Sequence, residues 1–414
     1  MKTIFLSMLT IAALASCTRQ DFIDPNGSGT DPGGTGDEMV VELTISSTPL
    51  TKATGQASES DKKIDDITVF GVNTTSKAVI SRQFFSATTE SPLEEVSPDG
   101  GGVMKASFKT TDQTDAIYVI ANVGTDLTGV GEVLNLTNIG ALNNAKASLL
   151  FPGNVERGDG KVLMSGYTNT IEGKIGTELP ATASVSLNFI ASKVILKSIT
   201  RAEGAKGEYG TNFELVGAML SNVNTAAYYF ADSYPFNTGE FTYSSFIKAI
   251  TTPGVAREAM PMQLVSGAKA PAEAGEKVEK VTAFYEDLSS TPALDNTHSL
   301  NDVAYWYVFE NSNDPNATKS KQTAFQLEYK HKTGDGHTIE THKYISVIFG
   351  NNGYPKLEPG KTYAVNIQFD ADLSENATPP GGDDPDVSVV EGQIGVTVTP
   401  AEWTPGTDVD KPVK

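Results

Sequence analysis

Hydrophobic and polar residues alternate with a period of two along most of the chain. The first such run is MVVELTIS, residues 39–46, in which every second residue is apolar. Because successive side chains of a β-strand point to opposite faces, this alternation predicts a strand with one buried face. Further strands are predicted over 64–73, 103–109, 115–124, 161–167, 184–200, 212–223, 303–311, 323–332, 341–349 and 361–369. The chain is therefore expected to be all-β.

Helical periodicity is scarce. The best helix candidate is IGALNNAKASLL, residues 139–150, and it is short. Glycine (38) and proline (21) are plentiful and separate the predicted strands. Many strands separated by turns are typical of β-sandwiches. A chain of 414 residues is long enough for two such sandwiches in tandem. The run 184–200 is long enough to leave one sandwich and enter the next, which places the boundary near residue 190.

The predicted organisation has five parts. They are a lipoprotein signal peptide (1–16), a flexible tether (17–38), an N-terminal sandwich (39–190), a C-terminal sandwich (191–373), and a linker with one more strand (374–414). The tether is rich in Gly, Pro and Asp and has too little apolar content to fold. A second linker of this kind, SENATPPGGDDPD (374–386), precedes the last alternating run, VSVVEGQIGVTVTPAEW (387–403). A strand that belongs to its own domain more usually follows a short turn.

The N-terminal segment predicts export. It has one early lysine, an apolar stretch from Ile4 to Leu14 and small residues before Cys17. This pattern is typical of a signal peptide and is too short for a membrane-spanning helix. Leu14-Ala15-Ser16-Cys17 is similar to a bacterial lipobox, in which the cysteine carries acyl chains such as palmitate. The alternative is an incidental cysteine beside an ordinary signal-cleavage site.

Charge and side-chain chemistry argue against several function classes. The net charge of −20 is the opposite of the basic footprint that nucleic acid requires. Cys17 is the only cysteine, so the body of the chain has no cysteine nucleophile and no disulfide. We expect the four histidines to be solvated turn residues rather than metal ligands: His298, His331, His337 and His342. We expect no enzyme, no metal and no cofactor, although 51 acidic residues leave a chance glycosidase-like pair open.

Two strands at opposite ends of the chain share a pattern. Residues 41–45 (VELTI) and 394–398 (IGVTV) both carry apolar residues at alternate positions, with threonine in the same intervening slot. Either could fill the same groove between two strands, because such a groove recognises alternate side chains and backbone groups. Lys52 stands alone just after the first copy, as the only basic residue between Arg19 and Lys62.

Together these features resemble the fimbrillins of Bacteroidetes, the subunits of type V pili. The resemblance covers most of the chain and rests on the lipobox and on motifs in a fixed order. These motifs are AIYVIANVG (116–124), LMSGY (163–167), YVFEN (307–311), LEPGKTYAVNIQF (357–369) and VTVTPAEW (396–403). One departure is VSLNFIASKV (185–194), where many relatives carry an arginine and this chain has Asn188 and Phe189.

The resemblance implies two tandem Greek-key, transthyretin-like β-sandwiches and a structural role in a fimbrium. The precursor would reach the outer membrane as a lipoprotein acylated at Cys17, and a trypsin-like protease would cut between Lys52 and Ala53. The cut would release residues 39–52, and the vacated groove would take a C-terminal strand from another subunit. The apolar positions implied for the displaced strand are Met39, Val41, Leu43 and Ile45, and those implied for the donor strand are Ile394, Val396, Val398 and Trp403.

Other readings stay open at this level. The partners implied are copies of the chain, other pilus subunits, the protease and the outer membrane, and the final location is a cell-surface fimbrium that mediates adhesion. A stalk subunit is favoured over a tip, which should lack a donor strand, and over an anchor, which should keep its first strand and lipid. From a different class, the chain could be a glycan-binding surface lipoprotein, with Tyr305, Trp306 and Tyr307 as a stacking platform.

Overall fold

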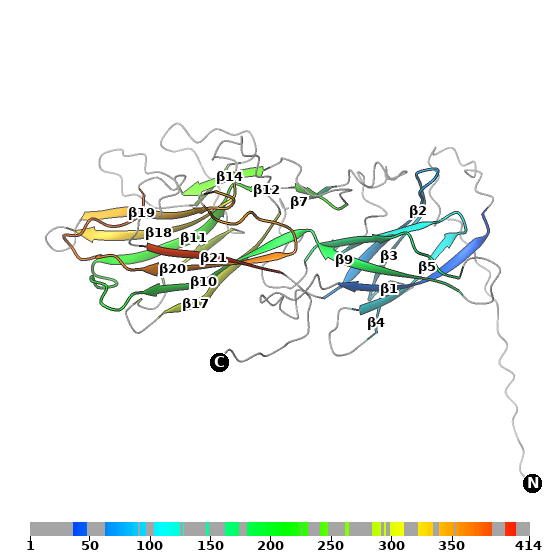
Figure 1. Ribbon diagram of the computed structural model, residues 1–414, viewed down its shortest axis with the longest axis horizontal. Helices are drawn as coiled ribbons and strands as arrows, with labels where there is room; N and C mark the ends of the chain where they lie inside the picture. The colour runs from blue at the N-terminus through cyan, green and yellow to red at the C-terminus, as the bar shows by residue number, and fades with distance from the viewer. Residues whose placement is uncertain are drawn as a thin grey trace, which may run out of the picture.

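The computed structural model gives an all-β fold in which two sandwiches follow one another along the long axis (Figure 1). The described residues are 36–47, 63–89, 92–96, 103–124, 127, 146–148, 162–173, 180–224, 226–230, 241–246, 261–264, 284–290, 294, 299–309, 322–333, 339–351, 353–382 and 394–402. Within these ranges the regular elements are strands, and no helix is long and apolar enough to cross a membrane.

The first sandwich is built from an eight-stranded sheet in the order β3-β2-β6-β8-β9-β1-β5-β4. Its strands are β1 (Glu38–Ser47), β2 (Asp66–Asn73), β3 (Ala78–Ser86), β4 (Glu94–Glu95), β5 (Val103–Thr111), β6 (Ala116–Ala121), β8 (Met164–Thr168) and β9 (Ala181–Phe189). Strands β8 and β9 join only at Met164↔Phe189 and Ser165↔Asn188, so the sheet turns a corner there and encloses its core. Buried and exposed residues alternate along β9, so one face of this strand lines the core and the other faces solvent.

The second sandwich packs a seven-stranded sheet on a four-stranded one. The larger sheet has the order β15-β14-β12-β17-β10-β20-β21, and the smaller has the order β16-β11-β18-β19. The strands are β10 (Ala191–Arg201), β11 (Phe213–Ser221), β12 (Val223–Asn224), β14 (Phe241–Phe246), β15 (Pro261–Leu264), β16 (Tyr285–Asp287), β17 (Leu300–Phe309), β18 (Ala324–Thr333), β19 (Ile339–Ile348), β20 (Lys361–Phe369) and β21 (Ile394–Glu402). Aromatic side chains fill its core, with Trp306, Tyr329 and Tyr363 fully buried.

The two sandwiches are in contact through residues of both halves. The chain runs from β9 through Ile190 directly into β10. Ala191 packs in the first core and Val194 packs in the second, so the chain crosses from one sandwich to the other in this stretch. Phe230 packs edge-on against Tyr118 of the first sandwich at 5.1 Å between ring centroids. The hydroxyl of Ser165 donates a hydrogen bond to the carbonyl of Tyr229. These contacts couple the two bodies beyond a single covalent crossing.

A small sheet between the sandwiches corrects the helix prediction. Residues 146–148, inside the predicted helix 139–150, form strand β7 (Lys146–Ser148). This strand pairs antiparallel with β13 (Ala226–Tyr228), whose sequence neighbours lie in the first core. A pairing partner some eighty residues away therefore overrides the local helical pattern. The rest of the predicted helix lies outside the described residues.

Candidate functional site

Strand β1 occupies an interior position in the first sandwich (Figure 1). It runs antiparallel to β5, from Glu38↔Thr111 to Ser46↔Val103. On its other side it runs parallel to β9, from Val41↔Ala181 to Ser47↔Leu187. The first strand of the chain thus lies in a groove whose two walls come from later parts of the sequence.

One face of β1 belongs entirely to the first core. The four apolar residues predicted for the displaced strand are all buried there: Met39, Val41, Leu43 and Ile45. Burying aliphatic side chains of this size contributes roughly 1.5–3 kcal/mol each. On the opposite face, Ser107 of β5 donates a 2.8 Å hydrogen bond to the carboxylate of Glu42. Without β1, the first sandwich would expose an apolar groove between β5 and β9.

The second sandwich has a strand with the same surroundings. Strand β10 lies between an antiparallel neighbour, β17, and a parallel neighbour, β20. Strand β1 lies in the same way between β5 and β9. The difference is covalent, because β10 continues directly from β9 whereas β1 precedes every other described strand. A cut in the segment after β1 would leave that strand held by non-covalent contacts alone.

The last described strand lies on the second sandwich of its own chain. Strand β21 pairs antiparallel with β20, from Ile394↔Phe369 to Glu402↔Lys361, at one edge of the seven-stranded sheet. Val396 and Val398 are half-buried against the second core. The sequence placed this strand on a free linker, and the structure instead shows it as an edge strand. Cys17, Lys52, Ala53 and Trp403 lie outside the described residues.

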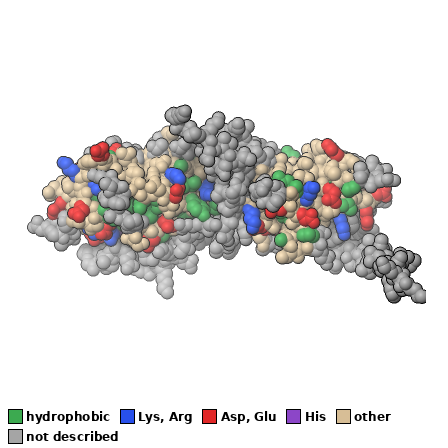
Figure 2. Space-filling view, turned by 90° about the horizontal axis from the view of Figure 1, so that it is seen from below, with side chains coloured by type: hydrophobic (Ala, Val, Ile, Leu, Met, Phe, Trp, Pro, Cys, Tyr) green, Lys and Arg blue, Asp and Glu red, His purple; other side chains and the backbone are tan. Residues whose placement is uncertain are grey.

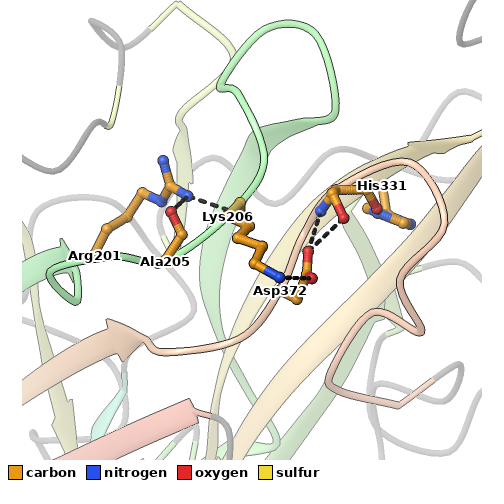
Figure 3. A network of polar contacts seen from close by, with 6 residues as sticks. Arg201, Ala205, Lys206, His331 and Asp372 are labelled. Atoms are coloured by element: carbon orange, nitrogen blue, oxygen red, sulfur yellow. Dashed lines mark hydrogen bonds and ion pairs between the residues drawn. The ribbon is translucent and has the colours of Figure 1, made fainter.

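The segment after β20 is held to the second sandwich, as Figure 3 shows in part. Asp372 accepts a hydrogen bond from the backbone N–H of Ser374 at 2.9 Å and forms a 3.5 Å ion pair with Lys206. The imidazole Nε2 of His331 lies 3.2 Å from the carbonyl oxygen of Leu373 and 3.1 Å from that of Ser374. The hydrogen bonds from Ser374, with the nearby ammonium of Lys206, lower the pKa of Asp372.

These contacts correct the predicted linker. The hydroxyl of Tyr329 donates to the carbonyl of Pro380, and Tyr344 bridges to Gly382. Residues 374–382 of the predicted linker 374–386 are thus fixed on the second sandwich. Residues 383–393, between Gly382 and β21, lie outside the described residues.

Two of the histidines were assigned wrongly. His331 and His342 are buried rather than solvated, and they lie within the paired strands β18 and β19 rather than in the turn between them. His342 Nδ1 lies 2.5 Å from the carboxylate of Glu328, which also accepts a 3.2 Å hydrogen bond from the hydroxyl of Tyr344. The hairpin register, which brings Glu328 opposite Tyr344, could have indicated this cluster. Among the described residues, no group of three His, Cys, Asp or Glu side chains could hold a metal ion.

The aromatic trio of β17 does not form an exposed platform. Trp306 is buried in the second core and Tyr307 in the first. The Lys193 ammonium lies 4.6 Å from the ring centroid of Tyr305 and 5.3 Å from that of Tyr307. These side chains therefore pack the junction of the sandwiches.

Acidic and basic side chains are interspersed over the described part of the face seen in Figure 2.

Comparison with solved structures identifies proteins of the same fold. A protein from Bacteroides eggerthii proposed to act in cell adhesion aligns with a TM-score of 0.60 at 19% identity, over 88% of this chain and 96% of that one. Another, from Parabacteroides distasonis, aligns with a TM-score of 0.52 at 16% identity, over 90% and 99%. A fimbrilin from Porphyromonas gingivalis aligns with a TM-score of 0.48 at 15% identity, over 88% and 98%.

The sequence matches no family model and no curated protein. At the identities found, the likeness to solved structures shows the fold. The all-β fold class predicted from the sequence is confirmed.

Proposed function

We propose that the chain is a structural subunit of a cell-surface fimbrium, assembled by exchange of its first strand for a strand of another subunit. One observation carries the proposal. Strand β1 fills an interior groove between β5 and β9 yet is joined to the rest of the chain only through the segment that contains Lys52. A strand in that position can be removed by one peptide cleavage without breaking any other connection of the sandwich.

Processing begins at the outer membrane. The precursor is exported as a lipoprotein, with acyl chains on Cys17 that hold it to the lipid. A trypsin-like protease then cuts between Lys52 and Ala53, which separates β1 and its lipid from the subunit. Cleavage at Arg19 would be a poor alternative, because it would remove the lipid and leave β1 in place.

Assembly follows from the exposed groove. The donor is the C-terminal strand, residues 387–403, of the neighbouring copy or of another pilus subunit. Burial of Ile394, Val396 and Val398 contributes roughly 1.5–3 kcal/mol each, and the backbone ladder adds to this. Donation from head to tail does not close on itself, so it builds a filament rather than a ring. The interface is durable because its release requires a strand to be pulled from an interior position.

The assigned place in the filament is the stalk. A stalk subunit needs both a groove and a donor, and the chain supplies β1 as the removable strand and β21 as the donor. Further support for adhesion as the role of the filament comes from the shared fold, since two of its matched structures are proteins proposed to act in cell adhesion. The subunit itself performs no reaction in this account and needs no cofactor.

The test is cleavage of purified, lipid-free precursor with a trypsin-like protease. We expect the new N-terminus at Ala53 and ladders of SDS-resistant oligomers in unheated samples. Lys52→Gln should block both, and deletion of residues 387–414 should abolish the ladders without unfolding the subunit. If the deleted form still polymerises after cleavage, the C-terminal strand is not the donor.

A further inference from the structure

Asn122 follows β6 and holds the chain where it enters β2. It belongs to the motif AIYVIANVG, whose last residues have no part in the proposed strand exchange. Its φ of 64° lies in the left-handed region, which asparagine adopts more readily than most residues. Its backbone N–H donates a 3.0 Å hydrogen bond to the carbonyl of Asp66, the first residue of β2. The buried side chain of Asn122 is thereby placed beside the segment that leads into β2.

The side-chain amide of Asn122 binds this segment on both sides of Ile64. Its Nδ2 donates a 2.7 Å hydrogen bond to the carbonyl of Lys63, and its Oδ1 accepts a 2.9 Å hydrogen bond from the backbone N–H of Asp65. Ile64 itself is buried in the first core. We call these four residues, Lys63, Ile64, Asp65 and Asn122, the asparagine clamp. The clamp fixes the two backbone groups that flank Ile64.

The clamp is anchored in the first sandwich independently of β1. The Nδ2 of Asn122 also donates a 2.9 Å hydrogen bond to the carbonyl of Val162. The carboxylate of Asp66 accepts 3.1 Å hydrogen bonds from the backbone N–H groups of Val123 and Gly124. None of these groups belongs to β1, so the removal of β1 breaks none of these hydrogen bonds.

The clamp protects the Lys63–Ile64 bond from a trypsin-like protease. Such a protease places the carbonyl of the bond that it cuts in an oxyanion hole, where backbone N–H groups donate to it. A folded segment is therefore cut only when it opens locally, at a rate that follows the population of the open form. In the clamp, the Lys63 carbonyl already accepts a hydrogen bond from Asn122, and Ile64 is buried. The exposed 2.8 Å ion pair between Lys63 and Asp65 adds little to this protection.

The sequence between β1 and β2 contains three lysines and no arginine. The lysines are Lys52, Lys62 and Lys63, and a cut after any of them would detach β1. Lys62 directly precedes the clamp, so a protease that cuts there has to draw Lys63 and Ile64 out of it. Lys52 precedes Lys63 by eleven residues and is not part of the clamp.

We infer that Asn122 is a positioning residue that confines processing to Lys52, because it keeps the chain around Lys63 closed to the protease. Hydrolysis adds one water across the cut bond and leaves a carboxylate on the lysine and an amino group on the next residue. After a cut at Lys63, that charged amino group would lie on the buried Ile64, where it would be costly. The inference rests on the proposed cleavage, and it explains why Lys52→Gln alone is expected to block release of β1.

The test is limited digestion of the lipid-free precursor with trypsin, with the new N-termini identified by mass spectrometry over time. In the wild type, Ala53 should appear as an N-terminus before Lys63 or Ile64 does. Asn122→Gly removes the side-chain amide and keeps the left-handed backbone. This variant should be cut after Lys62 and Lys63 roughly thirtyfold faster, because the segment loses two hydrogen bonds.

The matched control is Asn222→Gly. Asn222 is also a buried asparagine with a positive φ, and it lies between β11 and β12 of the second sandwich. Its substitution should leave the order in which the N-termini appear unchanged. An equal effect of Asn222→Gly and Asn122→Gly would overturn the inference, because general destabilisation would then account for the new cuts.

Lys52→Gln tests the same inference in a chain whose clamp is intact, whether or not Asn122→Gly folds. Its β1 should stay attached when the wild type has released it, whereas the double variant Lys52→Gln with Asn122→Gly should release β1 through cuts after Lys62 and Lys63. Prompt cleavage of the Lys52→Gln chain after Lys62 or Lys63 would overturn the role of Asn122 while release of β1 stands. If the wild type is not cut after Lys52, the proposed processing fails and this inference fails with it.

Discussion

Val41 of β1 lies directly opposite Phe108 of β5, and both side chains are fully buried in the first core. The contact joins the most N-terminal described strand to a wall formed more than sixty residues later. In the proposed account this contact is temporary, since it stabilises the precursor and is absent from the filament. Mutations in β1 should therefore affect the stability of the precursor, whereas mutations in β21 should affect assembly of the filament.

Leu43→Ala should destabilise the precursor. Truncation of a buried leucine typically costs about 2–5 kcal/mol, because the lost contacts leave a cavity. Chemical denaturation of the lipid-free precursor measures this loss, and Val40→Ala is the control because Val40 is 41% exposed. After cleavage and assembly, filaments of the Leu43→Ala variant should melt like the wild type. A lower melting temperature of those filaments would mean that β1 stays in the assembled subunit.

Ser47→Ala should have the opposite effect on the precursor. The Ser47 hydroxyl is buried and has no hydrogen-bond partner among the described residues, so its removal should increase the free energy of unfolding by about 1 kcal/mol. The same change should slow the release of the cleaved strand, measured as the rate at which ladders appear. Ser46→Ala, on the less buried face of β1, is the matched control and should alter neither quantity. A faster exchange in the Ser47→Ala variant would show that this hydroxyl stabilises β1 in the groove.

Val396→Asp should abolish ladders while leaving the free subunit folded. A carboxylate in the apolar groove would be desolvated without a partner. In the subunit's own second sandwich, Val396 is only half-buried on an edge strand, so the unfolding midpoint should change little. Val396→Ile supplies the control and should keep the ladders. Equal loss of folding and of assembly would show instead that β21 serves mainly the second sandwich.

The contacts of Asp372 predict a small dependence of stability on pH. Its pKa is lower in the folded chain than its ordinary value, so the carboxylate form stabilises the fold. This contribution is present above about pH 4 and is lost as the pH falls through the lowered pKa. The difference in unfolding midpoint between wild type and Asp372→Asn should therefore shrink on acidification. A difference that grows at low pH would contradict the assigned contacts.

The fold could be predicted largely because alternation is a local property. Predicted strands over 64–73, 103–109 and 361–369 agree with β2, β5 and β20 to within two residues at each end. Strands β3, β14 and β15 were not predicted, since their alternation is weak and their pairing partners define them. The helix predicted over 139–150 failed for a related reason, because its residues 146–148 pair with a distant strand.

The site was predictable in its parts and not in its arrangement. The sequence of β1 indicates a buried face, and Met39, Val41, Leu43 and Ile45 are buried as expected. Its interior position between β5 and β9 depends on long-range pairing that no local pattern encodes. The resting place of β21 was missed because the edge of β20 and a groove between two strands accept the same alternating sequence.

Cleavage after Lys52 should release the first strand before the subunit joins a filament. Mass spectrometry of the mature N-terminus, on chains isolated from assembled surface fibres, measures whether this happens. We expect an N-terminus at Ala53 and no residue of β1. An acylated Cys17 on the assembled chain would contradict it.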